Sequence, residues 1–239
     1  MKKCLLGITI LLLLSACANS EPAIVKEETV PEPDSEPELV EEEIDDAEQV
    51  DEFIEFPLQD EQITVNLEMV PILSEYLSAI PDRKKEIEEM RIDRLTSKDE
   101  SIYLLEFSCH NELCSYLLFS QEKEKQAYLL ADLAKASNII TSPDNTKLLF
   151  QFNREGSLPL PLANIVVIDI ENWKTVSLSN YTNDANILDY TWPLLQAEWI
   201  DNETISVEKP SVIEPTDELI DEWLKTEEAS TTNIIMRTN

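Results

Sequence analysis

The chain has 239 residues, and its 49 acidic against 18 basic side chains give a formal net charge of −31 at neutral pH. Nucleic acid and anionic lipid surfaces carry the same sign, so both are excluded as direct electrostatic partners. The length allows one domain with a long appendage. Acidic and basic residues are unevenly distributed along the chain: residues 18–62 contain eighteen acids and a single base, Lys26.

The first residues have the pattern of an export signal. Two lysines, Lys2 and Lys3, precede an apolar run over residues 4–14, and the small residues Ser15 and Ala16 follow. A basic start, a short apolar stretch and small residues before a break are typical of a secretory signal peptide. The run is shorter than the roughly 20 apolar residues that a membrane-spanning helix needs.

The end of this segment, Leu14-Ser15-Ala16-Cys17, resembles the lipobox of bacterial lipoproteins. The resemblance implies that residues 1–16 are removed and that Cys17 receives a diacylglyceryl group and a further acyl chain, such as palmitate. It also implies a lipid-anchored protein on the extracytoplasmic face of the cell membrane or the outer membrane, and Ala18 in place of Asp favours the outer one. The alternatives are a plain signal peptide with a chance cysteine, or an uncleaved anchor.

Residues 17–61 are rich in Glu, Asp and Pro, with no aromatic residue before Phe53. High charge and few apolar residues predict a segment that cannot bury enough surface to fold. We therefore expect an acidic disordered tether that spaces the domain from the membrane. The alternative is an acidic tail that binds a basic partner or Ca²⁺.

Residues 62–239 are expected to form a single α+β domain, mainly an antiparallel β-meander with blade-like hairpins. Two N-terminal helices are predicted, from Pro71 to about Ile80 and from Asp82 to about Leu95, and a C-terminal helix from about Thr216 to Lys225. Alternating apolar residues and turn signals predict strands. These strands are 63–69, 102–109, 114–120, 126–131, 147–153, 164–170, 175–178, 195–200, 204–208 and 232–237.

One part of this strand region resembles a known repeat. Ser142-Pro143-Asp144-Asn145 leads into an apolar run, and residues 164–171 end in Asp169-Ile170-Glu171. With a weaker copy at Trp199-Ile200-Asp201, this pattern is similar to the blades of TolB-type β-propellers over residues 102–208. Asn145 replaces the usual Gly, and about three blades are fewer than a closed propeller uses. We expect the hairpins to form an open antiparallel sheet.

Cys109 and Cys114 remain after Cys4 leaves with the signal and Cys17 takes the lipid. An even pair in an oxidising compartment, flanking a four-residue loop between two strands, predicts a disulfide. Free thiols are one alternative. A metal or redox site built from Cys109, His110 and Cys114 is the other, although the set lacks a fourth ligand and a common zinc spacing.

No catalytic motif is found, and we expect neither enzymatic activity nor a cofactor or metal. The only glycine after the signal, Gly156, excludes nucleophile elbows and phosphate-binding loops. The loop over residues 154–163, with its two prolines, is a place where function can reside. A possible binding surface comprises the aromatic residues Trp173, Tyr181, Tyr190 and Trp192.

The sequence thus favours an envelope lipoprotein that acts as a non-enzymatic binding or interaction module, with the membrane and another envelope protein as its partners. The alternative is a secreted hydrolase that uses carboxylates on envelope glycan, because paired acids are abundant. The sequence gives no oligomeric state.

Replacing Cys17 with Ser tests the anchor. Without its acyl chains the acidic protein has nothing that attracts it to a membrane, so fractionation should find it folded and soluble. A variant that stays membrane-bound and uncut would point instead to an uncleaved helical anchor.

Overall fold

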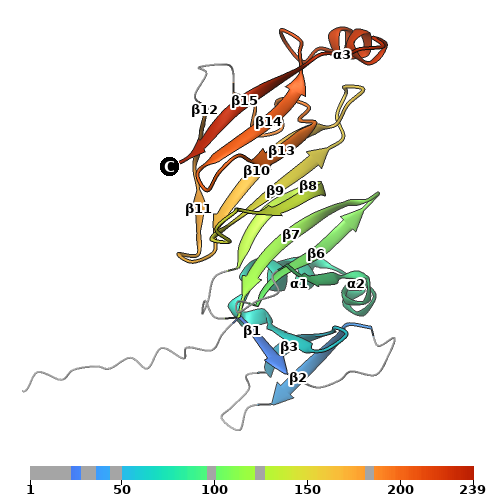
Figure 1. The fold of residues 1–239 in the computed structure, drawn as a ribbon. Helices are drawn as coiled ribbons and strands as arrows, with labels where there is room; N and C mark the ends of the chain where they lie inside the picture. Colours follow the sequence, from blue (N-terminus) through green and yellow to red (C-terminus); the bar gives the residue numbers. More distant parts are fainter. Residues whose placement is uncertain (1–22, 28–35, 44–49, 96–100, 122–126, 181–185) are drawn as a thin grey trace, which may run out of the picture.

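The computed structural model describes residues 23–27, 36–43, 50–95, 101–121, 127–180 and 186–239, and most of them lie in antiparallel strands (Figure 1). The described strands form three hydrogen-bonded sheets and no closed barrel. Figure 1 shows the sheets stacked in chain order, with the strands within residues 24–57 at one end and those within residues 178–180 and 204–238 at the other. The antiparallel, strand-rich fold that the sequence predicts is confirmed.

The first sheet has the strand order β1-β4-β3-β2, with every pair antiparallel. Its strands are β1 (Ile24–Glu27), β2 (Glu38–Glu43), β3 (Val50–Pro57) and β4 (Gln62–Asn66).

Three of these strands lie within residues 17–61, where the sequence predicts a disordered tether. The folded body therefore begins before residue 62, which corrects that expectation. Ile24, Ile54 and Phe56 are each at most 1% exposed and belong to the first hydrophobic core. Acidic residues such as Glu55 alternate with these apolar positions along β3. Because a strand presents successive side chains to opposite faces, the acids can stay on the outer face while the apolar residues are buried.

Two short helices follow the first sheet, so they are not N-terminal to the fold as expected. After the 3₁₀ helix η1 (Leu67–Met69), α1 (Pro71–Ala79) begins with Pro at its first position and buries Leu73 and Leu77. In α2 (Arg83–Glu89) the Asp82 side chain accepts a hydrogen bond from the Lys85 amide, which caps the helix. This helix ends at Glu89 instead of near Leu95, because the strand β5 (Arg91–Arg94) follows and pairs with β6 (Ile102–His110).

The second sheet is a seven-stranded meander in chain order, from β5 to β11. Its long strand β8 pairs with β7 through its first half and with β9 through its second half. Register shifts in both pairings and a positive φ at Leu133 mark the bend between the halves. The strands are β5 (Arg91–Arg94), β6 (Ile102–His110), β7 (Leu113–Ser120), β8 (Tyr128–Thr141), β9 (Lys147–Arg154), β10 (Leu162–Asp169) and β11 (Lys174–Val176).

The third sheet has the order β12-β15-β14-β13. The helix α3 (Asp217–Leu224) lies between β14 and β15 in the chain, and the Thr216 hydroxyl caps it by accepting from the Leu219 amide. The strands are β12 (Leu178–Asn180), β13 (Gln196–Trp199), β14 (Thr204–Pro210) and β15 (Thr231–Thr238).

Central strands bury both of their faces, because each lies between two layers of the stack. In β6, Tyr103 and Leu105 enter the first core while Leu104 enters the second; in β9, Phe150 enters the second core and Leu149 the third. Burying one such side chain contributes roughly 1.5–3 kcal/mol. Three cores in series therefore explain why these strands read as continuous apolar runs in place of an alternating pattern.

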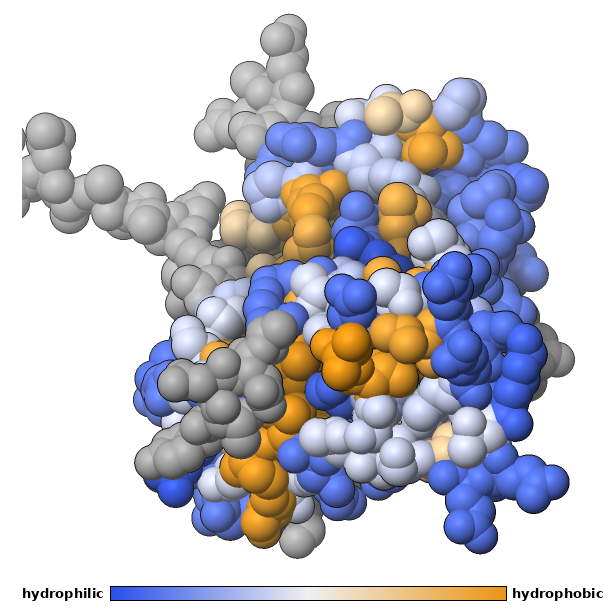
Figure 2. All heavy atoms as spheres, turned by 90° about the horizontal axis from the view of Figure 1, so that it is seen from above, coloured by the Kyte–Doolittle hydropathy of each residue, from blue (hydrophilic) through white to orange (hydrophobic). Residues whose placement is uncertain are grey.

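The last sheet ends the stack with a polar outer face. Ile205 and Val207 of β14 are buried in the third core, whereas the alternate residues Ser206 and Glu208 are partly exposed. Figure 2 shows the molecule from above as a largely hydrophilic surface on which apolar residues gather in small groups. No helix within the described ranges has the length and apolar character needed to cross a bilayer.

A buried carboxylate connects the first two sheets. Glu61 is 3% exposed, and its carboxylate lies 2.6 Å from Lys26 Nζ on β1 and 3.5 Å from an Arg94 guanidinium nitrogen on β5. The Tyr103 hydroxyl on β6 donates to it at 3.1 Å. The hydrogen bond with Glu61 raises the pKa of Lys26. Two cations and a hydroxyl thus offset the desolvation cost of this buried carboxylate. The same contacts hold β1 against the second sheet.

Replacing Glu61 with Ala should lower the free energy of unfolding by about 2–4 kcal/mol, because it removes the buried carboxylate that Lys26 and the Tyr103 hydroxyl contact. Urea unfolding measures the change. Glu88→Ala is the control, since it removes only a 3.8 Å pair with Lys84, whose side chain is 86% exposed, and should have little effect. Equal losses in the two variants would contradict the role given to Glu61.

Candidate functional site

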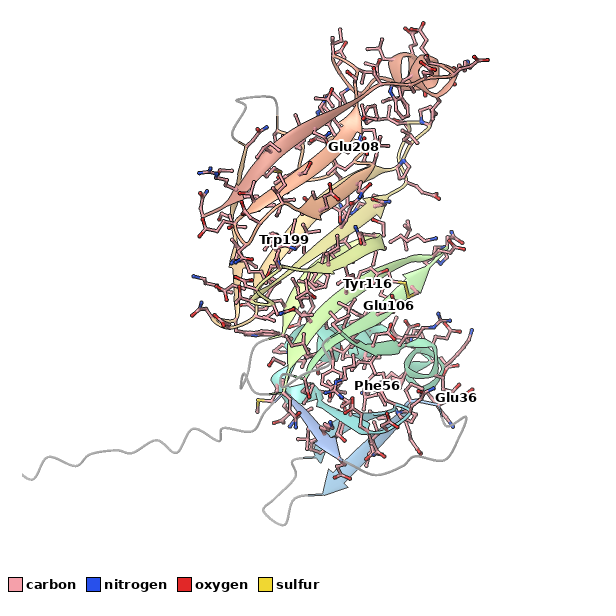
Figure 3. The ribbon with its side chains drawn as sticks, viewed as in Figure 1. Glu36, Phe56, Glu106, Tyr116, Trp199 and Glu208 are labelled. Atoms are coloured by element: carbon pink, nitrogen blue, oxygen red, sulfur yellow. A yellow bond between two sulfur atoms is a disulfide. The ribbon has the colours of Figure 1, made fainter. Side chains whose placement is uncertain are left out.

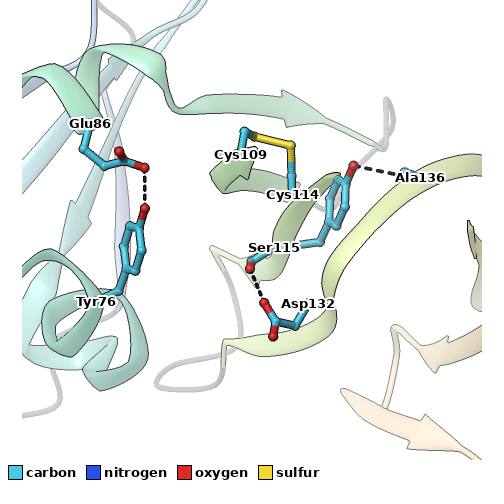
Figure 4. The surroundings of a disulfide bond; sticks show 8 residues. Tyr76, Glu86, Cys109, Cys114, Ser115, Asp132 and Ala136 are labelled. Carbon is cyan, nitrogen blue, oxygen red and sulfur yellow. Dashed lines mark hydrogen bonds between the residues drawn. A yellow bond between two sulfur atoms is a disulfide. The ribbon is translucent and has the colours of Figure 1, made fainter. Parts of the chain in front are cut away.

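The hairpin of β6 and β7 ends in the predicted cysteine pair. Cys109 and Cys114 lie at disulfide distance, with their Cα atoms 4.1 Å apart (Figure 4). Cys109 is exposed at the end of the hairpin, whereas Cys114 is only 6% exposed and packs in the second core. The backbone of this hairpin turns tightly, with positive φ angles of 53° at Ser108, 50° at Asn111 and 65° at Glu112.

Two hydrogen bonds fix the hairpin to the bent strand β8 beside it. The Ser115 hydroxyl donates to the Asp132 carboxylate at 2.6 Å, and the Ala136 amide donates to the Tyr116 hydroxyl at 3.0 Å (Figure 4). Ser115 and Tyr116 lie within the stretch between Cys114 and Leu117 where the register between β7 and β8 shifts and the regular ladder is interrupted. Side chains therefore replace the missing strand pairing and position the disulfide.

The apolar face that β6 turns toward the second core ends at Glu106. Ile102, Leu104 and Glu106 occupy alternate positions of β6, and the first two are buried in that core. Glu106 pairs with Arg91 on one side and with Tyr116 on the other in the strand register; Figure 3 shows Glu106 and Tyr116 on neighbouring strands. Burial, followed by repulsion from Asp93, raises the pKa of the Glu106 carboxyl.

The helix pair α1–α2 is held over the same end of β6. The Tyr76 hydroxyl on α1 donates to the Glu86 carboxylate on α2 (Figure 4). The Tyr76 ring also packs edge-on against Phe107, with ring centroids 5.3 Å apart. Burial and the bond to Glu86 raise the pKa of Tyr76 to about 12, so this hydroxyl stays a donor at neutral pH. The contact places Glu88 and Glu89 of α2 opposite the hairpin.

A groove of about 760 Å³ lies between α2, the hairpin and β8, and we call it the hairpin groove. It contains four glutamates and two basic residues, with the disulfide in its wall. Its lining residues are Glu88, Glu89, Arg91, Glu106, Cys109, Glu112, Cys114, Tyr116, Lys135 and Ala136.

A second groove, of about 380 Å³, lies on the other side of the hairpin tip, and we call it the loop groove. The 155–161 part of the proline-containing loop forms one wall, so the structure brings this loop and the cysteine hairpin together. The Oδ1 atom of Asn153 in this groove is buried and accepts no hydrogen bond from any described residue. The lining residues are Asn111, Glu112, Leu113, Lys135, Asn153, Glu155, Gly156, Leu158, Pro159 and Pro161.

An ion pair separates the two grooves. Lys135 Nζ donates to the Glu112 carboxylate at 2.7 Å, and both residues line both grooves. Their side chains are 58% and 80% exposed. The hydrogen bond from Lys135 lowers the pKa of Glu112. A pair so exposed is weak and screened by salt, so an incoming charged group can replace either partner.

The metal alternative for the cysteines does not fit this geometry. Within the described ranges, the sulfur atoms of Cys109 and Cys114 and a carboxylate oxygen of Glu106 lie within 4.8 Å of one another, and His110 is not in that group. A metal requires thiolate ligands, whereas these sulfur atoms are joined to each other.

The expected aromatic surface is not assembled. Trp173 and Trp192 are each 5% exposed and belong to the second and third cores, respectively. Tyr190 is half-buried beneath the Arg154 guanidinium, whose carbon lies 3.8 Å from the ring centroid. Tyr181 and the lipobox cysteine, Cys17, lie outside the described residues. The two tryptophans therefore serve as packing residues, which corrects their assignment to a binding surface.

Apart from the predicted cysteine pair, the residues that build the hairpin groove were not identified from the sequence, Glu106 above all. The signal is present: Glu106 interrupts the apolar run 102–107 of a strand that buries both faces. A charged residue at a core position is rare without a partner or a function.

We compared the chain with protein-family models, with curated proteins and with solved structures, and none of the three comparisons found a match.

Proposed function

We propose that the protein is a lipid-anchored, extracytoplasmic binding module that recognises a basic, extended segment of another envelope protein at its disulfide-bonded hairpin. The observation that carries this proposal is the hairpin groove, which gathers four glutamates around about 760 Å³. Concave sites with a few convergent polar groups are where proteins bind ligands.

Charge selects a cationic partner. Of the two basic residues in the hairpin groove, Lys135 is already paired with Glu112. Glu88 and Glu89 lie 3.8 and 3.6 Å from Lys84 and Lys85 on the same helix, but those lysines are 86% and 70% exposed. Such pairs contribute little, so lysine or arginine side chains of a partner can displace them. The acidity of the whole chain would further attract a basic partner.

The loop groove favours an extended segment with an apolar residue. Leu113, Leu158 and Pro159 supply apolar surface there, next to the ridge formed by Glu112 and Lys135. The buried Asn153 Oδ1 lacks a donor among the described residues, and a backbone N–H of the segment would satisfy it. An extended chain offers such groups regularly, with side chains alternating between the two sides.

The N-terminal sequence supports the cellular setting of this proposal. The Leu14-Ser15-Ala16-Cys17 resemblance to a lipobox places an acylated Cys17 at the start of the mature chain, in the cell membrane or the outer membrane. The likeness of residues 102–208 to TolB-type blades, together with the layered sheets, supports a recognition scaffold whose hairpin ends bind partners.

Calorimetric titration with a short synthetic peptide that alternates lysine and leucine tests the binding. Glu88→Gln combined with Glu89→Gln should weaken the affinity about tenfold, or about 1.4 kcal/mol, because two charges of the hairpin groove are lost. The matched control is Glu227→Gln with Glu228→Gln, which makes the same change in net charge at two exposed positions after α3.

Equal losses in the two double variants would reduce the effect to general acidity and contradict the proposed site. A peptide with glutamine in place of each lysine should bind much more weakly. Hydrolysis of envelope glycan that disappears on replacing a single carboxylate would contradict a non-enzymatic function and support the hydrolase alternative.

A further inference from the structure

The disulfide at the hairpin is asymmetric in a way that suits exchange chemistry. Cys109 is exposed to solvent, whereas Cys114 is 6% exposed and packs in the second core. A thiolate attacks the sulfur that it can reach, so Cys109 Sγ is the accessible electrophile. The sulfur that then leaves is Cys114 Sγ, and a thiolate is disfavoured in apolar surroundings. Cleavage of this bond is therefore helped by a proton donor beside Cys114.

Glu106 is placed to be that donor. Its carboxylate oxygen and both sulfur atoms lie within 4.8 Å of one another, close enough for proton transfer through one water. Arg91 and Tyr116 flank it in the strand register, and Asp93 adds negative charge nearby. Burial and Asp93 raise the pKa of Glu106, which increases the fraction of protonated carboxyl near neutral pH.

The backbone of the hairpin also favours opening. Ser108 and Glu112 hold positive φ angles, a conformation that is unfavourable for a non-glycine residue. Both residues lie at or next to the loop that the disulfide closes. Opening the bond allows this segment to relax.

We propose that the Cys109–Cys114 disulfide is redox-active and exchanges with the dithiol of a partner protein, with Glu106 as the proton donor. One partner thiolate attacks Cys109 Sγ, which forms a mixed disulfide and breaks the Cys109–Cys114 bond. The electron pair goes to Cys114 Sγ, which takes the proton of Glu106. The second partner thiolate then attacks the partner's own sulfur in the mixed disulfide and releases Cys109 as a thiolate, which takes a proton from solvent. The partner dithiol is oxidised by two electrons, and this protein is reduced to its dithiol; Glu106 regains a proton from solvent.

This activity goes beyond binding and does not depend on the basic segment, so its test uses dithiothreitol as the dithiol. Cys4→Ser and Cys17→Ser are introduced so that only the hairpin cysteines react. In the folded protein, without denaturant, dithiothreitol should reduce the disulfide, and alkylation with a maleimide of high mass reports the rate. Glu106→Gln should slow the reaction about tenfold or more, because the proton donor is lost.

Glu106→Asp keeps a carboxyl and should recover part of the rate, which a purely structural role of Glu106 does not predict. Glu208→Gln, which removes a half-buried carboxyl from β14 of the third sheet (Figure 3), is the matched control and should leave the rate unchanged. A disulfide that is reduced only after unfolding, or equal rates for Glu106→Gln and the parent, would overturn the proposal.

The asymmetry of the pair has its own test. With Cys114→Ser, the remaining Cys109 should react with a disulfide reagent such as dithionitrobenzoate roughly tenfold faster than Cys114 does in Cys109→Ser, because exposure and thiolate character control the rate. Thermal unfolding curves show whether each variant is folded. Equal reactivity in two folded variants contradicts the assignment of Cys109 as the attacked sulfur.

Discussion

Burial of both faces of the central strands is the constraint on which the rest of the structure depends. A strand such as β6 or β9 has no solvent-facing side, so it gains stability from two cores and tolerates few polar residues. Polar side chains therefore gather at the ends of strands, at hairpins and in the outer sheets, and the buried Gln151 within β9 donates to the Leu194 carbonyl. The buried Glu61 shows what an exception requires: two cations and a tyrosine hydroxyl surround it where β1 meets the second sheet.

The hairpin end of β6 is where that constraint is relaxed. After Leu104 the same face carries Glu106, and the next elements leave grooves on both sides of the hairpin tip. The proposed binding and the proposed exchange chemistry use this one place for the same reason: a partner chain that enters the grooves meets acidic side chains and the exposed sulfur of Cys109 together. Rigid strands on either side hold these groups in place, which reduces the entropy lost on binding.

Sequence patterns predicted most strands, α1 and the cysteine pair, because local periodicity and turn residues determine them. They failed where tertiary contacts decide. Residues 91–94 are charged enough to continue a surface helix, yet they pair with the edge of β6 and form a strand. The composition of the acidic stretch before residue 62 indicates that it cannot fold. A few of its apolar residues, such as Phe56, are nevertheless buried in the first core together with residues of the helices α1 and α2. Burial of Trp173 and the role of Glu106 depend on which layers lie above and below each strand, and periodicity within one strand does not contain that information.

Hydrogen–deuterium exchange of the oxidised protein, with and without the alternating lysine–leucine peptide, locates the bound segment most directly. If the grooves at the hairpin are the binding site, slower exchange will be confined to residues 88–91, 106–116, 135–136 and 153–161, the segments that line them. Protection concentrated instead around the tryptophan-containing segments 173–180 and 186–199, with the hairpin unchanged, would contradict the central claim and return the search to the aromatic residues.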